Sequence, residues 1–126
     1  MTNSAFVRTD PNVDFDWGAG SPDPSIAVDH FSVRWTGTVT ARFSETYTFY
    51  TTADDGTRLF VTGQSVIDNW VVQQSTEKSG TIKLQAGQPV GIRLEYFEAM
   101  GAALVSLSWS STSEPKAIVP TSRLRP

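Results

Sequence analysis

Apolar side chains in this sequence recur at every second position in several short segments, and this alternation is the feature that most restricts the fold. A period of two is typical of half-buried antiparallel strands, in which successive side chains point to opposite faces of the sheet. Five segments show it clearly: residues 31–35, 47–49, 82–84, 92–96 and 104–109. No segment keeps a period near 3.6 over the roughly ten residues that an amphipathic helix needs. The pattern predicts an all-β chain.

Residues that favour turns separate these segments at short intervals. Examples are Asp54-Asp55-Gly56, Thr62-Gly63-Gln64 and Ala86-Gly87-Gln88, which suit tight or left-handed backbone. Turns at this spacing predict about eight or nine short strands in a β-sandwich or barrel. Residues 10–30 contain several prolines and glycines and are expected to form a long ordered loop. We expect residues 1–126 to form one domain, in line with the length.

Charge and residue usage exclude several classes of function. The net charge is −3 and the ten Lys and Arg residues are scattered, which argues against nucleic acid as a partner. No stretch approaches the roughly 20 apolar residues of a membrane span, so no membrane insertion is expected. The absence of cysteine and the single histidine exclude disulfides and thiolate metal sites and argue against zinc. The start lacks the features of a secretion signal, and we expect the chain to be a fragment of a longer protein.

The order of several sequence blocks resembles that of one known family. Residues 12–18, 21–24 and 31–37 come first, and further blocks follow at residues 46–49, 54–59, 66–70 and 92–96. Over roughly residues 6–126, the series is similar to the PA-fourteen (PA14) domain, a module named after the protective antigen of a bacterial toxin. The resemblance implies an antiparallel β-sandwich of jelly-roll-like form.

The N-terminal part departs from the family pattern. Domains of this type usually begin with an additional strand upstream of the Asp10-Pro11 region, and only nine residues precede Asp10 here. The resemblance therefore implies a sandwich in which the first strand is absent or shortened. Because an open sheet edge invites pairing with another chain, we expect residues 1–9 to form a short replacement strand, or an oligomer to cover the edge.

The adjacent acids Asp54 and Asp55 are the strongest candidates for a binding site. By composition alone, Asp54-Asp55-Gly56 also suits a plain turn. The resemblance implies more: in sugar-binding members these two aspartates are joined by a cis peptide and bind one Ca²⁺ ion, which prefers oxygen ligands. By strand order, the loop that begins at Glu98 completes the site. Family lectins often have an asparagine there, so Glu98 adds charge for the ion but removes an amide that would hold a sugar hydroxyl.

Two residues at the end of the 66–70 block are candidates for contact with a sugar. Trp70 is expected either to stack on a pyranose ring or to pack in the core, as we expect of the other three tryptophans. Asn69 is expected either to bind a hydroxyl at the rim of the site or to satisfy loop backbone. The carbohydrate would reach the calcium through its hydroxyls, with Asp54 and Asp55 at the contact.

These observations predict a non-catalytic binding module. The leading hypothesis is a calcium-dependent carbohydrate-binding module of a secreted or cell-surface protein, such as a glycoside hydrolase or an adhesin. The alternative is a structural or protein-contact module in which calcium is purely stabilising. A glycosidase would need two carboxylates about 5–10 Å apart across a cleft, for which a small sandwich has little room. One histidine leaves no Ser-His-Asp triad without a further assumption.

Overall fold

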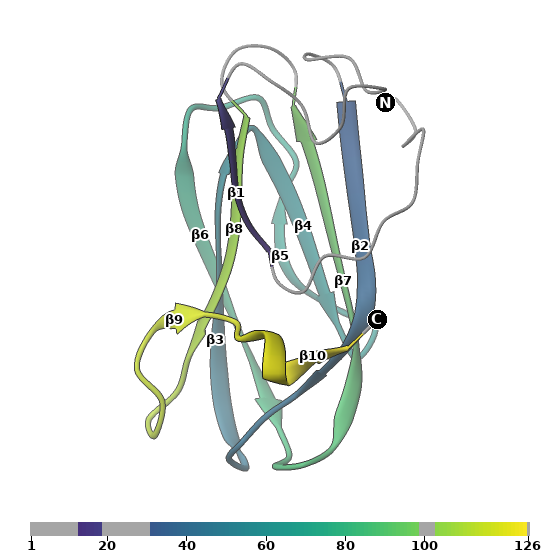
Figure 1. Cartoon of the computed structure of the whole chain (residues 1–126), viewed down its shortest axis with the longest axis vertical. Helices are drawn as coiled ribbons and strands as arrows, with labels where there is room; N and C mark the ends of the chain where they lie inside the picture. Colours follow the sequence, from purple (N-terminus) through teal and green to yellow (C-terminus); the bar gives the residue numbers. More distant parts are fainter. Residues whose placement is uncertain (1–12, 19–30, 99–102, 126) are drawn as a thin grey trace.

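Two β-sheets packed face to face form the framework of the protein (Figure 1). The computed structural model describes residues 13–18, 31–98 and 103–125. The first sheet has the order β1-β8-β3-β6, with β9 also paired to β8, and the second has the order β10-β2-β7-β4-β5. Every pair of strands in the two sheets is antiparallel. The predicted antiparallel β-sandwich is confirmed.

The strands are named in chain order. They are β1 (Asp14–Gly18), β2 (Phe31–Thr40), β3 (Glu45–Asp54), β4 (Gly56–Val61), β5 (Gln64–Asn69), β6 (Thr76–Leu84), β7 (Pro89–Glu98), β8 (Ala103–Ser110), β9 (Ala117–Ile118) and β10 (Leu124–Arg125). A 3₁₀ turn, η1 (Thr121–Arg123), precedes β10.

The five alternating segments of the sequence lie in β2, β3, β6, β7 and β8, as predicted. One prediction for the N-terminal region is wrong. Residues 10–30 were expected to be a loop, but Asp14–Gly18 form β1, which pairs with β8 through Phe15 and Val105. The segment Asp-Phe-Asp-Trp-Gly alternates like the other strands, and the prolines and glycines on either side obscured that signal.

The core lies between the sheets and is built from the inward positions of the alternating strands. Trp109 is its largest buried side chain, 1% exposed, and its ring lies 4.7 Å from that of Tyr47 and 6.0 Å from that of Phe49. Trp35 is partly buried against the same core. Burial of these aromatic and aliphatic side chains is the main stabilising contribution.

The two sheets approach each other closely where β5 faces β6. A Cβ atom on Gly80 of β6 would lie 1.9 Å from the main-chain carbonyl oxygen of Val66 on β5. Only glycine fits at this contact, because the neighbouring atom belongs to the backbone and not to a flexible side chain. The predicted replacement strand at residues 1–9 lies outside the described residues. Among the residues that are described, there is no helix with the length and apolar character to cross a bilayer.

Candidate metal centre

Two of the crossings between the sheets lie at the same end of the sandwich and meet at the site. β3 belongs to the first sheet and β4 to the second, and only Asp55 separates them. β7 of the second sheet, which ends at the top of Figure 1, leads to β8 of the first. The pairing register places these crossings side by side, because Asp54 lies opposite Leu104 on β8 and Gly56 lies opposite Phe97 on β7.

This arrangement brings together the three carboxylates that the sequence analysis proposed as metal ligands. One oxygen each from Asp54, Asp55 and Glu98 lies within 4.8 Å of the others. Asp55 is 3% exposed and Glu98 1%, whereas Asp54 is half-buried. The peptide bond between Asp54 and Asp55 is cis, as the resemblance implied.

The spacing of these oxygens fits a calcium ion. Ca²⁺ binds oxygen ligands at about 2.3–2.6 Å, so two ligands of one ion lie no more than about 5 Å apart. The three oxygens meet that limit. Main-chain carbonyl and water oxygens commonly provide further ligands of Ca²⁺, which takes six to eight in total.

The electrostatics of the cluster favour a cation. Burial, followed by the nearby charge of Asp55 and a hydrogen bond with it, raises the pKa of the Asp54 carboxyl above its ordinary value of 3.8. Carboxylates held together in a poorly solvated place repel one another, and a proton or a metal ion relieves that repulsion.

Hydrogen bonds fix the backbone and the side chain of Asp55. The main-chain N–H of Gln73 donates to Asp55 Oδ1 at 3.0 Å, and Gln73 Nε2 donates to the Asp55 carbonyl at 2.8 Å. The Asp55 N–H donates to the carbonyl of Phe97 at 3.2 Å. Gln73 lies in the segment between β5 and β6, so that segment positions a candidate ligand.

Tyr96 holds the other aspartate. Its hydroxyl, which is buried beneath the cluster, donates to the main-chain carbonyl of Asp54. Burial, and to a smaller extent the charges of Glu98, Asp55 and Asp54, raise the pKa of Tyr96 far above its ordinary value. The phenol therefore stays protonated and keeps its donor function at physiological pH.

The structure places the two predicted sugar-contact residues beside the centre. The carbonyl of Asn69 and the N–H of Val71 lie so close to Gly56 that a Cβ there would come within 2.8 Å of each. Trp70 is half-buried, with its ring 4.7 Å from that of Phe97 and 4.0 Å from the guanidinium carbon of Arg58. Trp70 therefore packs on the outer face of the second sheet, and its contact with a sugar stays a prediction.

Sequence reasoning missed two features near the site. Gln73 lies in a polar stretch with no local pattern that distinguishes it from Gln74. Arg34, Arg58 and Arg93, which surround Glu95, come from three different strands and meet only through the pairing of β2, β7 and β4. A sheet register would have revealed the second feature, but no signal in the sequence reveals the first.

Two proteins similar to this chain are named as an anti-sigma factor and as an anti-sigma factor domain-containing protein. The chain is 54% identical over 121 residues to the anti-sigma-I factor RsgI3 of Acetivibrio thermocellus, an alignment that covers 96% of the chain and 19% of that protein. A solved anti-sigma factor domain-containing protein matches with 55% identity and a TM-score of 0.95, over 96% of this chain and 42% of the other. The chain thus spans about a fifth and less than half, respectively, of these two relatives.

More distant structures share the fold. The PA14 sugar-binding domain from an RTX adhesin superposes with a TM-score of 0.71 at 21% identity, over 90% of this chain and 75% of that one. At that identity the likeness shows the fold alone. The sequence profile of the PA14 domain matches residues 2–122, nearly the whole chain. The chain therefore belongs to the PA14 domain family.

Proposed function

We propose that this PA14 domain is a non-catalytic, calcium-dependent carbohydrate-binding module. The observation that carries the proposal is the convergence of Asp54, Asp55 and Glu98 oxygens within 4.8 Å at one end of the sandwich. Asp54 and Asp55 would hold the ion from the crossing between β3 and β4, and Glu98 would hold it from the end of β7. A bound calcium with open positions accepts the hydroxyl oxygens of a sugar.

The partial exposure of Asp54 supports a site that a ligand reaches. Asp55 and Glu98 are buried, but Asp54 is half-buried and Asn69 and Trp70 beside it are also half-exposed. A sugar above Asp54 would meet the ion on its solvent side. Trp70 would offer an aromatic ring beside the end of β5, and the Asn69 amide nitrogen, which is buried without a hydrogen-bond partner, would have to turn outward to bind a hydroxyl. The name of the adhesin structure, a sugar-binding domain, supports the same assignment.

The module would belong to a longer regulatory protein. The sequence analysis suggested a glycoside hydrolase or an adhesin as the parent, whereas the similar sequences are anti-sigma factors of which the chain matches only a part. We infer that the module is the ligand-binding part of such a protein and lies at the cell surface or outside the cell. Binding of a glycan would then be a signal and not a step of catalysis.

The burial of two of the three carboxylates supports a second candidate function. With Asp55 at 3% and Glu98 at 1% exposure, calcium could be enclosed and serve only stability. In that case the ion would raise the thermal midpoint without making any glycan bind. The two functions differ in this one property.

A glycan array probed with the purified chain separates them. The chain is applied in millimolar calcium, in a calcium chelator, and as the Asp54→Ala variant in calcium. Binding that appears only for the unaltered chain in calcium supports the carbohydrate module. Calcium-dependent stabilisation without binding to any glycan supports the structural module. If calcium changes neither binding nor stability, both are wrong.

A further inference from the structure

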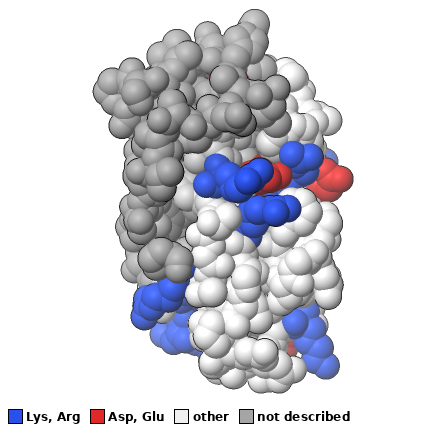
Figure 2. Space-filling view, turned by 90° about the vertical axis from the view of Figure 1, so that its right-hand side faces the viewer, with Lys and Arg blue, Asp and Glu red and all other residues white. Residues whose placement is uncertain are grey.

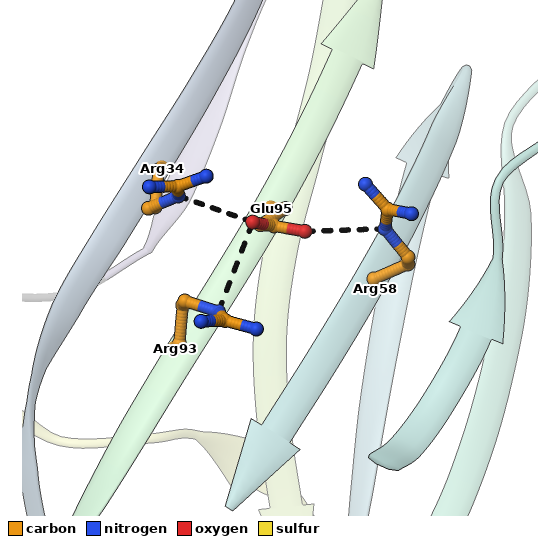
Figure 3. A network of polar contacts seen from close by, with 4 residues as sticks. All are labelled: Arg34, Arg58, Arg93 and Glu95. Atoms are coloured by element: carbon orange, nitrogen blue, oxygen red, sulfur yellow. Dashed lines mark hydrogen bonds and ion pairs between the residues drawn. The ribbon is translucent and has the colours of Figure 1, made fainter. Parts of the chain in front are cut away.

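Three arginines surround one carboxylate on the outer face of the second sheet (Figure 3). Arg34 Nε lies 3.1 Å from Glu95 Oε2, Arg58 Nε lies 3.1 Å from Glu95 Oε1, and Arg93 Nε lies 3.7 Å from Glu95 Oε2. Arg34, Glu95 and Arg58 are direct cross-strand neighbours on β2, β7 and β4. We call Arg34, Arg58 and Arg93 the arginine cluster.

The cluster contains more positive charge than its local acids balance. Among the described residues, Glu95 is the acid that contacts all three guanidinium groups, and Asp68 is the cross-strand neighbour of Arg58 on β5. With both acids counted, one positive charge remains in this described part of a chain whose net charge is −3. Figure 2 shows Lys and Arg atoms gathered around acidic atoms near the middle of one face of the molecule.

The guanidinium groups are accessible and held in place. The side chains of Arg34, Arg58 and Arg93 are 65%, 36% and 45% exposed, whereas that of Glu95 is 11% exposed. The Arg58 guanidinium stacks on the ring of Trp70 at 4.0 Å, and that of Arg93 on the ring of Phe60 at 4.3 Å. Each guanidinium has five N–H donors. Arg34 Nε donates one of its hydrogen bonds to Glu95, whereas Arg58 and Arg93 contact Glu95 as ion pairs.

This chemistry fits a carboxylate on a ligand. Guanidinium groups bind carboxylates through paired hydrogen bonds, and stacking on aromatic rings reduces the freedom that binding would otherwise remove. Along β7 the arginine cluster lies close to the candidate metal centre, since Glu95 is three positions before Glu98 and three residues of a strand span roughly 10 Å. The two carboxylates point to opposite faces of the strand, so a chain-like glycan bound at the metal centre would reach the cluster by passing over the end of the second sheet.

We propose that the arginine cluster is a binding surface for the carboxylate groups of a uronic-acid-containing carbohydrate. The chemistry of the cluster selects a carboxylate, which an acidic polypeptide would also carry. The choice of a carbohydrate as the ligand therefore rests on the proposed function. The inference goes beyond that function in assigning a second contact surface, away from the calcium ligands, and in naming acidic glycans as the preferred ligands.

Calorimetry with a matched pair of ligands tests the proposal. The ligands are a short uronic-acid oligosaccharide and the same oligosaccharide with its carboxyls reduced to alcohols, both at one fixed calcium concentration. The acidic form should bind more tightly, and added salt should weaken it selectively. Arg34→Gln and Arg93→Gln should each weaken it by roughly two- to fivefold, the range for exposed ion pairs, and should not change binding of the neutral form.

Two further variants complete the test. Asp68→Asn removes a competing negative charge and should strengthen binding of the acidic form, a gain that a merely structural role would not give. Arg42→Gln, at an exposed arginine between β2 and β3, is the matched control and should change nothing. Thermal midpoints of all variants show that they are folded.

The outcomes distinguish this inference from the proposed function. Equal binding of the two ligands, or arginine variants that bind like the unaltered chain, would overturn it even if calcium-dependent binding is intact. A poly-glutamate peptide that binds the cluster when the uronic acid does not would also overturn it. Loss of the calcium effect, with the arginine effects retained, would refute the metal proposal and leave this one standing.

Discussion

Strand β7 carries two buried glutamates whose surroundings have opposite charge. Glu95 faces outward, and three arginine Nε atoms lie 3.1–3.7 Å from its carboxylate. Glu98 lies on the other face of the strand, and two aspartate carboxylates lie within 4.8 Å of its own. The first carboxylate is neutralised by the chain itself. The second belongs to a group of like charges, and that difference distinguishes an internal ion-pair network from a candidate site for a cation.

Replacement of Glu98 is expected to have the largest effect on the free energy of unfolding. That effect should be neutral or stabilising without calcium and destabilising with it. In calcium-free buffer, Glu98→Gln removes one of three mutually repelling charges and should leave the free energy of unfolding unchanged or raise it by up to about 1 kcal/mol. In saturating calcium the variant should be less stable than the unaltered chain by about 2–3 kcal/mol, the size of the linkage term that it loses. Chemical denaturation in the two buffers measures both values. A variant that is destabilised equally in both would contradict a cation at this position.

Replacement of Glu95 should be insensitive to calcium. Glu95→Gln leaves three guanidinium groups close together without the carboxylate between them, and should lower the free energy of unfolding by about 1–3 kcal/mol. The loss is expected to be the same with and without calcium, because Glu95 faces away from the metal centre. The same denaturation series provides the measurement. A loss that depends on calcium would mean that the two carboxylates are coupled and that the contrast between them is wrong.

Gln73 tests whether the segment after β5 positions the metal ligands. Gln73→Ala removes the side-chain hydrogen bond to the Asp55 carbonyl and should weaken calcium binding by about tenfold, the lower end of the range for groups that orient a metal ligand. Gln74→Ala, at the exposed neighbour, is the control. Isothermal calorimetry with calcium compares the three proteins. Equal affinities for both variants would show that Gln73 does not contribute to the site.

The smallest expected effect is the pH dependence of the calcium stabilisation. The raised pKa of Asp54 means that the folded, calcium-free protein binds its proton more tightly than the unfolded chain does. That contribution to stability is complete below about 3.8 and is lost as the pH rises through the raised pKa. Calcium favours the deprotonated form, so the difference in thermal midpoint between calcium and calcium-free buffer should increase with pH.

Comparing the thermal midpoint in calcium with that in calcium-free buffer removes the effect of acids that do not contact the ion. Hydrogen bonds from Ser111 and Ser113 lower the pKa of Glu45, so its contribution to stability is lost as the pH falls through that lowered value. Glu45 lies at the start of β3, far along the strand from Asp54 at its end, and should affect both buffers equally. A midpoint difference that stays constant between acid and neutral pH would contradict protonation of the metal ligands.

The sequence predicted the strands better than it predicted how they meet. Alternation identified five strands because one face of each is buried, and that local period survives in any sandwich. It did not identify β1, since prolines and glycines surround its five residues. The pairing of β2, β7 and β4, which assembles the arginine cluster, depends on contacts between residues far apart in the chain. No local pattern encodes those contacts.

The candidate metal centre was predicted from a resemblance more than from physical chemistry. The adjacent acids Asp54 and Asp55 are visible in the sequence, but a turn explains them equally well. Glu98 was chosen by strand order, and the structure brings it to the pair because two crossings between the sheets lie side by side. The contribution of Gln73 depends on the conformation of the segment between β5 and β6, which residue types alone do not determine.

Calorimetric titration of the calcium-free chain with calcium is the most direct test of a cation held by Asp54, Asp55 and Glu98. The unaltered chain should bind one ion per molecule, with a dissociation constant in the millimolar range or below, the range known for calcium sites of extracellular modules. Asp54→Ala should remove that binding while the protein stays folded. If the unaltered chain shows neither binding heat nor a shift in thermal midpoint at millimolar calcium, the three carboxylates are not a calcium site.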